Sequence, residues 1–202
     1  MKKTILVRLQ LLMLILFCSM VSLTISPNTS FAMEWVKIKK EQSDILFYPP
    51  GGHSSIIHRE QENIKGKFFH TVWYNAAGFY PRGEVVLFDL IGRFFPYEAD
   101  LEEATRSWKY TKEKSLIFEE PQSIHNGFGK TLYQVFGLED QSCVGFLRYF
   151  GAAVSDNAGT SPGTKQLRGY YCFDTKGQLS ESQILTLLNA VSVRGEKAPI
   201  KP

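Results

Sequence analysis

The sequence lacks the short motifs by which metal and phosphate sites are usually found. It contains no H-E-x-x-H, C-x-x-C, G-x-G-x-x-G or P-loop, and it has no internal repeats or low-complexity tracts. Cysteine and histidine are scarce, with three and four copies in 202 residues. We therefore expect no metal site, no cofactor and no catalytic constellation.

The first 32 residues have the pattern of an export signal. A basic start precedes an almost wholly apolar run from Leu9 to Leu23, and Ser30-Phe31-Ala32 places small residues where a signal peptidase accepts them. We expect cleavage after Ala32, a single domain over 33–194 and a flexible tail over 195–202. The protein is then periplasmic or secreted, and it meets the membrane only transiently, through this leader.

Two alternatives for the leader are less favoured. An uncleaved anchor needs about 20 apolar residues, whereas this run is shorter and Cys18, Ser19 and Ser22 dilute its second half. Lipidation of Cys18 requires a small residue before it, and Phe17 occupies that position.

Without the leader, the chain lacks an excess of either charge. Three of the 23 Lys and Arg residues lie in the leader and no Asp or Glu does, which leaves 20 residues of each sign. A nucleic-acid-binding protein usually needs a basic surplus to displace phosphate counterions. We therefore expect no nucleic-acid partner.

Cleavage leaves two cysteines, and an even pair in an exported chain indicates a disulfide. Cys143 and Cys172 each lie in a strand-like segment, with a loop rich in Gly, Ser, Asp and Asn between them. If the two strands pair antiparallel with Leu147 opposite Arg168, then Cys143 faces Cys172 and a bridge would staple the hairpin. The alternative is a redox pair, but such sites usually keep their cysteines close in sequence.

The remaining patterns predict strands and two helices. Besides the two cysteine segments, the strand-like segments are 34–39, 45–48, 56–57, 68–74, 84–91, 116–118 and 130–136, with a charged connection over 59–67. The segment 84–91 is nearly continuously apolar, which indicates a strand covered on both faces. Helices are expected over Tyr97–Lys114 and Glu181–Ser192. We predict an α+β fold, with an antiparallel sheet of about six or seven strands covered by two helices and one disulfide-stapled hairpin.

Both predicted helices carry start signals. In the first, Asp100 is a capping residue, and Leu101, Ala104 and Trp108 share one face with Tyr97. In the second, Ser180 and Gln183 form a capping box and Gly195 follows the end, outside the helix.

One catalytic motif matches in letters only. The run 159–163 reads G-x-S-x-G, as in the nucleophile elbow of hydrolases. The elbow needs a strand before it, a helix after it and a backbone N–H after the serine. Because Pro162 has no N–H and the flanks have loop composition, we expect an ordinary hairpin loop.

Histidines are the remaining candidates for metal binding or acid–base chemistry. His53 and His58 are five residues apart, a spacing that suits one face of neither a helix nor a strand. A metal site there would need a carboxylate such as Glu60 or Glu62. His70 and His125 carry no motif spacing, so we interpret all four as ordinary histidines.

Aromatic residues are abundant in the mature chain, which holds 25 Phe, Trp and Tyr. Most lie in strand-like segments, where a core accounts for them. Phe79 and Tyr80 lie in a predicted turn and are the candidate surface for a partner or apolar ligand. The alternative is that they cover the open end of the sheet.

The C-terminal third resembles a group of small exported bacterial proteins of unknown function. The resemblance rests on Cys143-Val144-Gly145-Phe146, Gly169-Tyr170-Tyr171-Cys172 and Leu179-Ser180 before the last helix, and it covers about 50 residues. It implies export and a paired hairpin, and it brings no activity with it.

These patterns favour a non-catalytic envelope protein that binds another envelope protein or an apolar ligand. The alternative is a secreted hydrolytic enzyme in which His53, His58 or His70 meets a carboxylate in a cleft. A thiol redox protein is a third, weaker hypothesis.

Overall fold

The computed structural model of the protein describes residues 34–47, 49–50, 56–75, 81–91, 99–152, 154–156, 159–161 and 163–196. They all belong to one compact unit, Glu34–Pro202. The predicted leader over 1–32, with its cleavage point after Ala32, lies outside the described residues. Among the described helices, none has the length and apolar character needed to cross a membrane.

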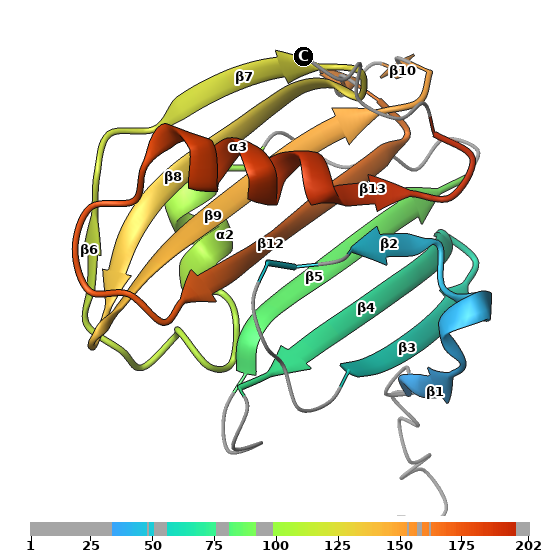
Figure 1. The fold of residues 1–202 in the computed structure, drawn as a ribbon. Coiled ribbons are helices and arrows are strands. Elements are labelled where there is room, and N and C mark those ends of the chain that lie inside the picture. The colour runs from blue at the N-terminus through green and yellow to red at the C-terminus, as the bar shows by residue number, and fades with distance from the viewer. Residues whose placement is uncertain are drawn as a thin grey trace, which may run out of the picture. The chain divides into compact units, whose positions relative to one another are not determined.

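A nine-stranded antiparallel sheet forms the centre of the fold (Figure 1). Its order is β1-β3-β4-β5-β12-β9-β8-β6, and β7 also pairs with β8. The strands are β1 (Val36–Ile38), β3 (Ile56–Asn63), β4 (Gly66–Tyr74), β5 (Pro81–Leu90), β6 (Leu116–Phe118), β7 (Gln122–Asn126), β8 (Gly129–Leu138), β9 (Gln141–Phe150) and β12 (Lys165–Phe173). The predicted α+β class is confirmed, while the predicted number of strands was too low.

The sheet is larger than predicted because two polar segments are strands. The charged connection predicted over 59–67 is the hairpin of β3 and β4, where Lys67 Nζ lies 2.9 Å from Glu60 Oε1 across the strands. The polar strand β7 was missed altogether. It pairs only with β8 and is largely exposed, so it carries no apolar alternation by which to recognise it.

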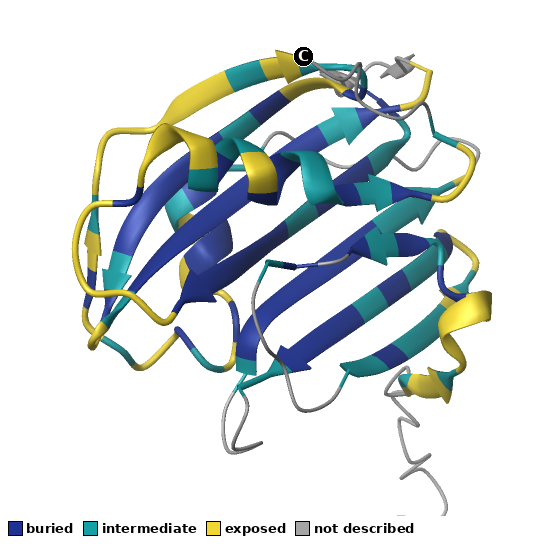
Figure 2. Cartoon of the chain, viewed as in Figure 1, coloured by how far each residue is buried: buried dark blue, intermediate teal, exposed yellow. Residues whose placement is uncertain are grey.

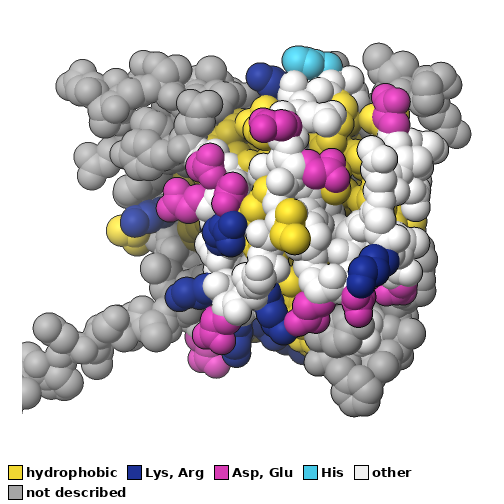
Figure 3. Space-filling view, turned by 90° about the vertical axis from the view of Figure 1, so that its left-hand side faces the viewer, with side chains coloured by type: hydrophobic (Ala, Val, Ile, Leu, Met, Phe, Trp, Pro, Cys, Tyr) yellow, Lys and Arg dark blue, Asp and Glu magenta, His cyan; other side chains and the backbone are white. Residues whose placement is uncertain are grey.

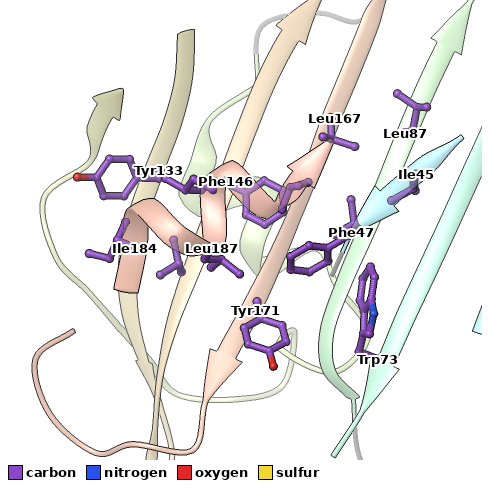
Figure 4. Close-up of a cluster of buried hydrophobic side chains, with 14 of the residues drawn as sticks. Ile45, Phe47, Trp73, Leu87, Tyr133, Phe146, Leu167, Tyr171, Ile184 and Leu187 are labelled. Atoms are coloured by element: carbon purple, nitrogen blue, oxygen red, sulfur yellow. The ribbon is translucent and has the colours of Figure 1, made fainter. Parts of the chain in front are cut away.

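One face of the sheet is covered by α3 (Glu181–Ala190) and by a small sheet of β2 (Ile45–Phe47) and β13 (Val191–Val193) (Figure 1). We call this the α3 face. Its side chains make the larger part of the core, in which Ile184 and Leu187 of α3 and Phe47 of β2 meet Phe146, Tyr171 and Trp73 of the sheet (Figure 4). The inward side of α3 is buried and its outward side is exposed (Figure 2).

The helix α3 begins as predicted and ends earlier. The Ser180 hydroxyl and the Gln183 side chain form the predicted capping box. The helix stops at Ala190, because Val191 is extended and starts β13, which pairs with β2. A β-branched Val-Ser-Val run suits a strand better than a last helical turn.

The opposite face of the sheet is covered by α2 (Leu101–Arg106) and the turns that follow it; we call it the α2 face. Asp100 caps the helix, and Leu101, Ala104 and Trp108 are buried as the predicted stripe requires. The predicted extension to Lys114 is wrong. Side-chain hydroxyls after the first turns bond to backbone carbonyls, as Thr111 Oγ1 does to Thr105 O at 2.5 Å, and such bonds compete with helix propagation.

The predicted hairpin of the two cysteine strands is confirmed in register and in covalent pairing. Strands β9 and β12 place Leu147 opposite Arg168 and Cys143 opposite Cys172, and the two cysteines form a disulfide. The connection contains a two-stranded ribbon of β10 (Val154–Asp156) and β11 (Gly159–Ser161), so the predicted plain loop is wrong there. The G-x-S-x-G run begins in that ribbon, and among the described residues no helix follows it before β12.

Candidate functional site

Three polar side chains meet on the α2 face from strands distant in sequence. Glu84 of β5 lies opposite Tyr170 of β12 and diagonal to His70 of β4, which itself pairs with Val86. The Tyr170 hydroxyl donates to Glu84 Oε1 at 3.0 Å, and His70 Nε2 lies 3.1 Å from Glu84 Oε2. Each carboxylate oxygen therefore has a partner of its own.

Burial of this cluster sets the protonation state of Tyr170. Glu84 is only 6% exposed and Tyr170 is fully buried. Desolvation, reinforced by the neighbouring Glu84, raises the pKa of Tyr170 well above its usual value. Because the phenol stays protonated, it remains a donor to the carboxylate. In the tautomer of His70 that carries its hydrogen on Nε2, this nitrogen donates to Glu84 Oε2 and Nδ1 is the acceptor.

Aromatic rings surround the histidine. The ring centroid of His70 lies 5.4 Å from that of Trp35 and 5.9 Å from that of Trp108. Trp108 also contacts Tyr170 edge-on at 5.9 Å. The side chain of His70 is accordingly only 12% exposed.

A groove of about 490 Å³ opens over this cluster. It lies between strands β3, β4 and β5 and the turns that follow α2. Its lining combines aromatic, apolar and charged side chains: Arg59, His70, Val72, Tyr74, Pro81, Glu84, Lys109, Tyr110, Glu113 and Lys114. Among these residues there is no Ser, Thr or Cys, so the described lining offers no hydroxyl or thiol nucleophile of the usual kind.

The structure separates the histidines that the sequence offered as candidates. His58 lies on the other face of β3, buried, with Nδ1 3.1 Å from Thr71 Oγ1, and burial lowers its pKa. His125 is exposed on β7, and His53 lies outside the described residues. Of the three described histidines, only His70 lies beside a carboxylate in a groove.

The remaining candidates do not assemble into a metal or partner site that the structure describes. Within the described part of the chain, no three His, Cys, Asp or Glu side chains are grouped as metal ligands would be. Glu60, proposed as a ligand, forms its ion pair with Lys67. The predicted partner surface, Phe79 and Tyr80, lies outside the described residues, in the connection between β4 and β5.

On the side of the molecule that carries β6, the described residues form no patch of a single charge (Figure 3). Basic, acidic and apolar side chains are interspersed there (Figure 3). Such mixing is ordinary for a solvated surface.

Sequence reasoning named His70 but missed its two partners. Glu84 begins a segment predicted to be covered on both faces, and a carboxylate in such a segment is unusual. The position of Glu84 in this apolar segment is the feature by which the sequence could have marked it as a candidate site residue. The approach of Tyr170 depends on the order of strands in the sheet, which the sequence did not specify.

No family model, curated protein or solved structure matches the chain. The resemblance of the C-terminal third to small exported proteins stays a prediction.

Proposed function

We propose that the protein is an exported, non-catalytic binding protein of the cell envelope, and that the groove on the α2 face is its ligand site. The observation that carries the proposal is the lining of the groove, in which Tyr74, Tyr110 and Val72 offer apolar surface beside the buried His70–Glu84 pair. A concave, largely preformed site with apolar walls and a few polar groups suits a small ligand.

Export is part of the same proposal. The disulfide between Cys143 and Cys172 is compatible with an oxidising compartment, periplasmic or extracellular. Recovery of the protein from the periplasm or medium, with a mature N-terminus at Met33 by mass spectrometry, tests this part. Intact chain in the cytosol with both thiols open to alkylation contradicts it.

Binding can be tested with a neutral aromatic probe. N-phenyl-1-naphthylamine becomes fluorescent in an apolar site, and we expect saturable binding with one site per chain. Tyr74→Ala, which removes a wall of the groove, should weaken it. The matched control is Ile117→Ala on β6, which removes a side chain that is 77% exposed and does not belong to the lining. No saturable binding, or equal binding by both variants, would contradict the proposal.

A second candidate function is hydrolysis, and the contact between His70 Nε2 and Glu84 Oε2 favours it. A carboxylate that orients an imidazole leaves Nδ1 to take a proton from water while the water oxygen attacks the ester carbon. As the acyl C–O bond breaks, the imidazolium returns that proton to the departing alcohol oxygen. We expect His70→Gln to lower the rate of 4-nitrophenyl acetate hydrolysis, with the exposed His125→Gln as the control. A wild-type rate equal to that of His70→Gln would reject this function.

A further inference from the structure

Basic side chains form a row across three strands beside the groove. In the sheet register, Lys37 of β1 lies opposite Arg59 of β3, and Arg59 lies opposite His70 of β4. Directly opposite residues share a face of an antiparallel sheet, so all three lie on the α2 face. The contact between the rings of Trp35 and His70 agrees with this assignment, because Trp35 and Lys37 are two residues apart in sequence.

Within the described parts of β1, β3 and β4, Lys37 and Arg59 lack acidic neighbours on their own face, whereas His70 contacts Glu84 of β5. Glu60 and Glu62 alternate with Arg59 along β3 and therefore lie on the α3 face, where Glu60 pairs with Lys67. The described part of β1, β3 and β4 places no Asp or Glu on the α2 face. Like charges directly opposite each other destabilise a sheet, so the pair of Lys37 and Arg59 lowers the stability of the protein unless a bound anion offsets the repulsion.

The opposite wall of the groove adds further positive charge. Lys109 and Lys114 both line it, and Lys114 Nζ is held 2.5 Å from Glu139 Oε1. Among the described residues, neither Arg59 nor Lys109 has an ionic partner.

Two carboxylates also line the groove, and neither forms an ion pair with Arg59 or Lys109. Glu84 is occupied by Tyr170 and His70, and the other carboxylate is the exposed Glu113. Arg59 and Lys109 thus face a shared groove from two sides.

We infer that the ligand of this groove carries an anionic group, which Arg59 and Lys109 bind, attached to an aromatic or aliphatic body. A guanidinium is well suited to carboxylate, sulfonate or phosphate oxygens. The apolar body would lie against Tyr74, Tyr110 and Val72. This inference rests on the proposed binding function and specifies its ligand class.

Two probes with the same ring skeleton test the inference. 8-Anilinonaphthalene-1-sulfonate carries a sulfonate that N-phenyl-1-naphthylamine lacks. We expect the sulfonate to bind at least about tenfold more tightly at low salt, an advantage that added salt reduces. The double variant Arg59→Gln with Lys109→Gln should abolish this advantage, so that it binds the two probes with similar affinity.

A charge-matched control separates the groove from general surface attraction. Lys65→Gln with Lys112→Gln removes two exposed cations that do not line the groove. The inference predicts that this variant keeps the sulfonate advantage. If both variants lose it equally, or if the two probes bind the wild type equally, the inference is overturned while the binding function stands. If neither probe binds, the proposed function itself fails.

Discussion

Tyr170 donates a hydrogen bond to Glu84 across strands β12 and β5, and the carboxylate has almost no contact with solvent. A buried carboxylate is stable only where donors replace the water that it has lost. Here the donors come from two strands on either side of β5, which are His70 on β4 and Tyr170 on β12. The polar cluster thereby links three central strands of the sheet at the floor of the groove.

The hydroxyl of Tyr170 should therefore matter more than that of its neighbour Tyr171. We expect Tyr170→Phe to lower the free energy of unfolding by about 2 kcal/mol, because it leaves a buried charge short of a donor. The control, Tyr171→Phe, removes a bond to the neutral backbone oxygen of Pro50 at 2.7 Å and should cost only about 1 kcal/mol. Urea unfolding of both variants measures the difference. Equal losses of unfolding free energy in the two variants would show that the hydrogen bond from Tyr170 to Glu84 contributes no more than the one from Tyr171 to Pro50.

The disulfide should be a major contributor to stability. Its cysteines are 29 positions apart, and for a loop of that length the chain-entropy model gives about 3.5 kcal/mol. We expect Cys143→Ala with Cys172→Ala to lower the free energy of unfolding by about 3 kcal/mol. Reductant should bring the wild type to the stability of the double variant. A loss below about 1 kcal/mol would contradict the entropic account of this bridge.

The parts of the fold that sequence predicted well are those with local or covalent signals. Cys143 and Cys172 fixed the register of β9 and β12, and Ser180 with Gln183 marked the start of α3. The end of α3 was missed because Val191 pairs with β2, more than a hundred residues earlier in the chain. A helical pattern cannot show such a distant partner.

The candidate site was less accessible to sequence analysis than the fold. His70 and Glu84 are neighbours because β4 and β5 pair in one register, with a bulge between Trp73 and Tyr74. Tyr170 joins them because β12 is inserted between β5 and β9 in the sheet. These relationships are set by long-range strand pairing, for which the sequence carried no separate signal.

The capping box at the start of α3 should contribute to the stability of the protein. Ser180→Ala removes a capping box and should lower the free energy of unfolding by about 1 kcal/mol. The control is Ser182→Ala, the same substitution at an exposed position two residues later, which should change it by less than about 0.5 kcal/mol. Thermal or urea unfolding measures both. If Ser182→Ala costs as much, the cap is not the source of the effect.

The buried histidine on the α3 face should make the protein sensitive to acid. Burial, followed by the nearby charge of Lys40, lowers the pKa of His58 from its usual value of 6.5. Just below that pH the unfolded chain therefore binds more protons at this position than the folded chain does. The stability associated with a neutral His58 is present above pH 6.5 and is lost as the pH falls through the lowered pKa.

His58→Gln removes this titration and should flatten the fall in the free energy of unfolding below pH 6.5. The exposed His125→Gln is the matched control and should leave the pH dependence of the wild type intact. Urea unfolding at about pH 7.5 and about pH 5 measures both variants. If His125→Gln flattens the curve as much as His58→Gln, burial of His58 beside Thr71 is not the source of the acid sensitivity. If only His58→Gln does so, the acid sensitivity arises from proton uptake by His58 on unfolding.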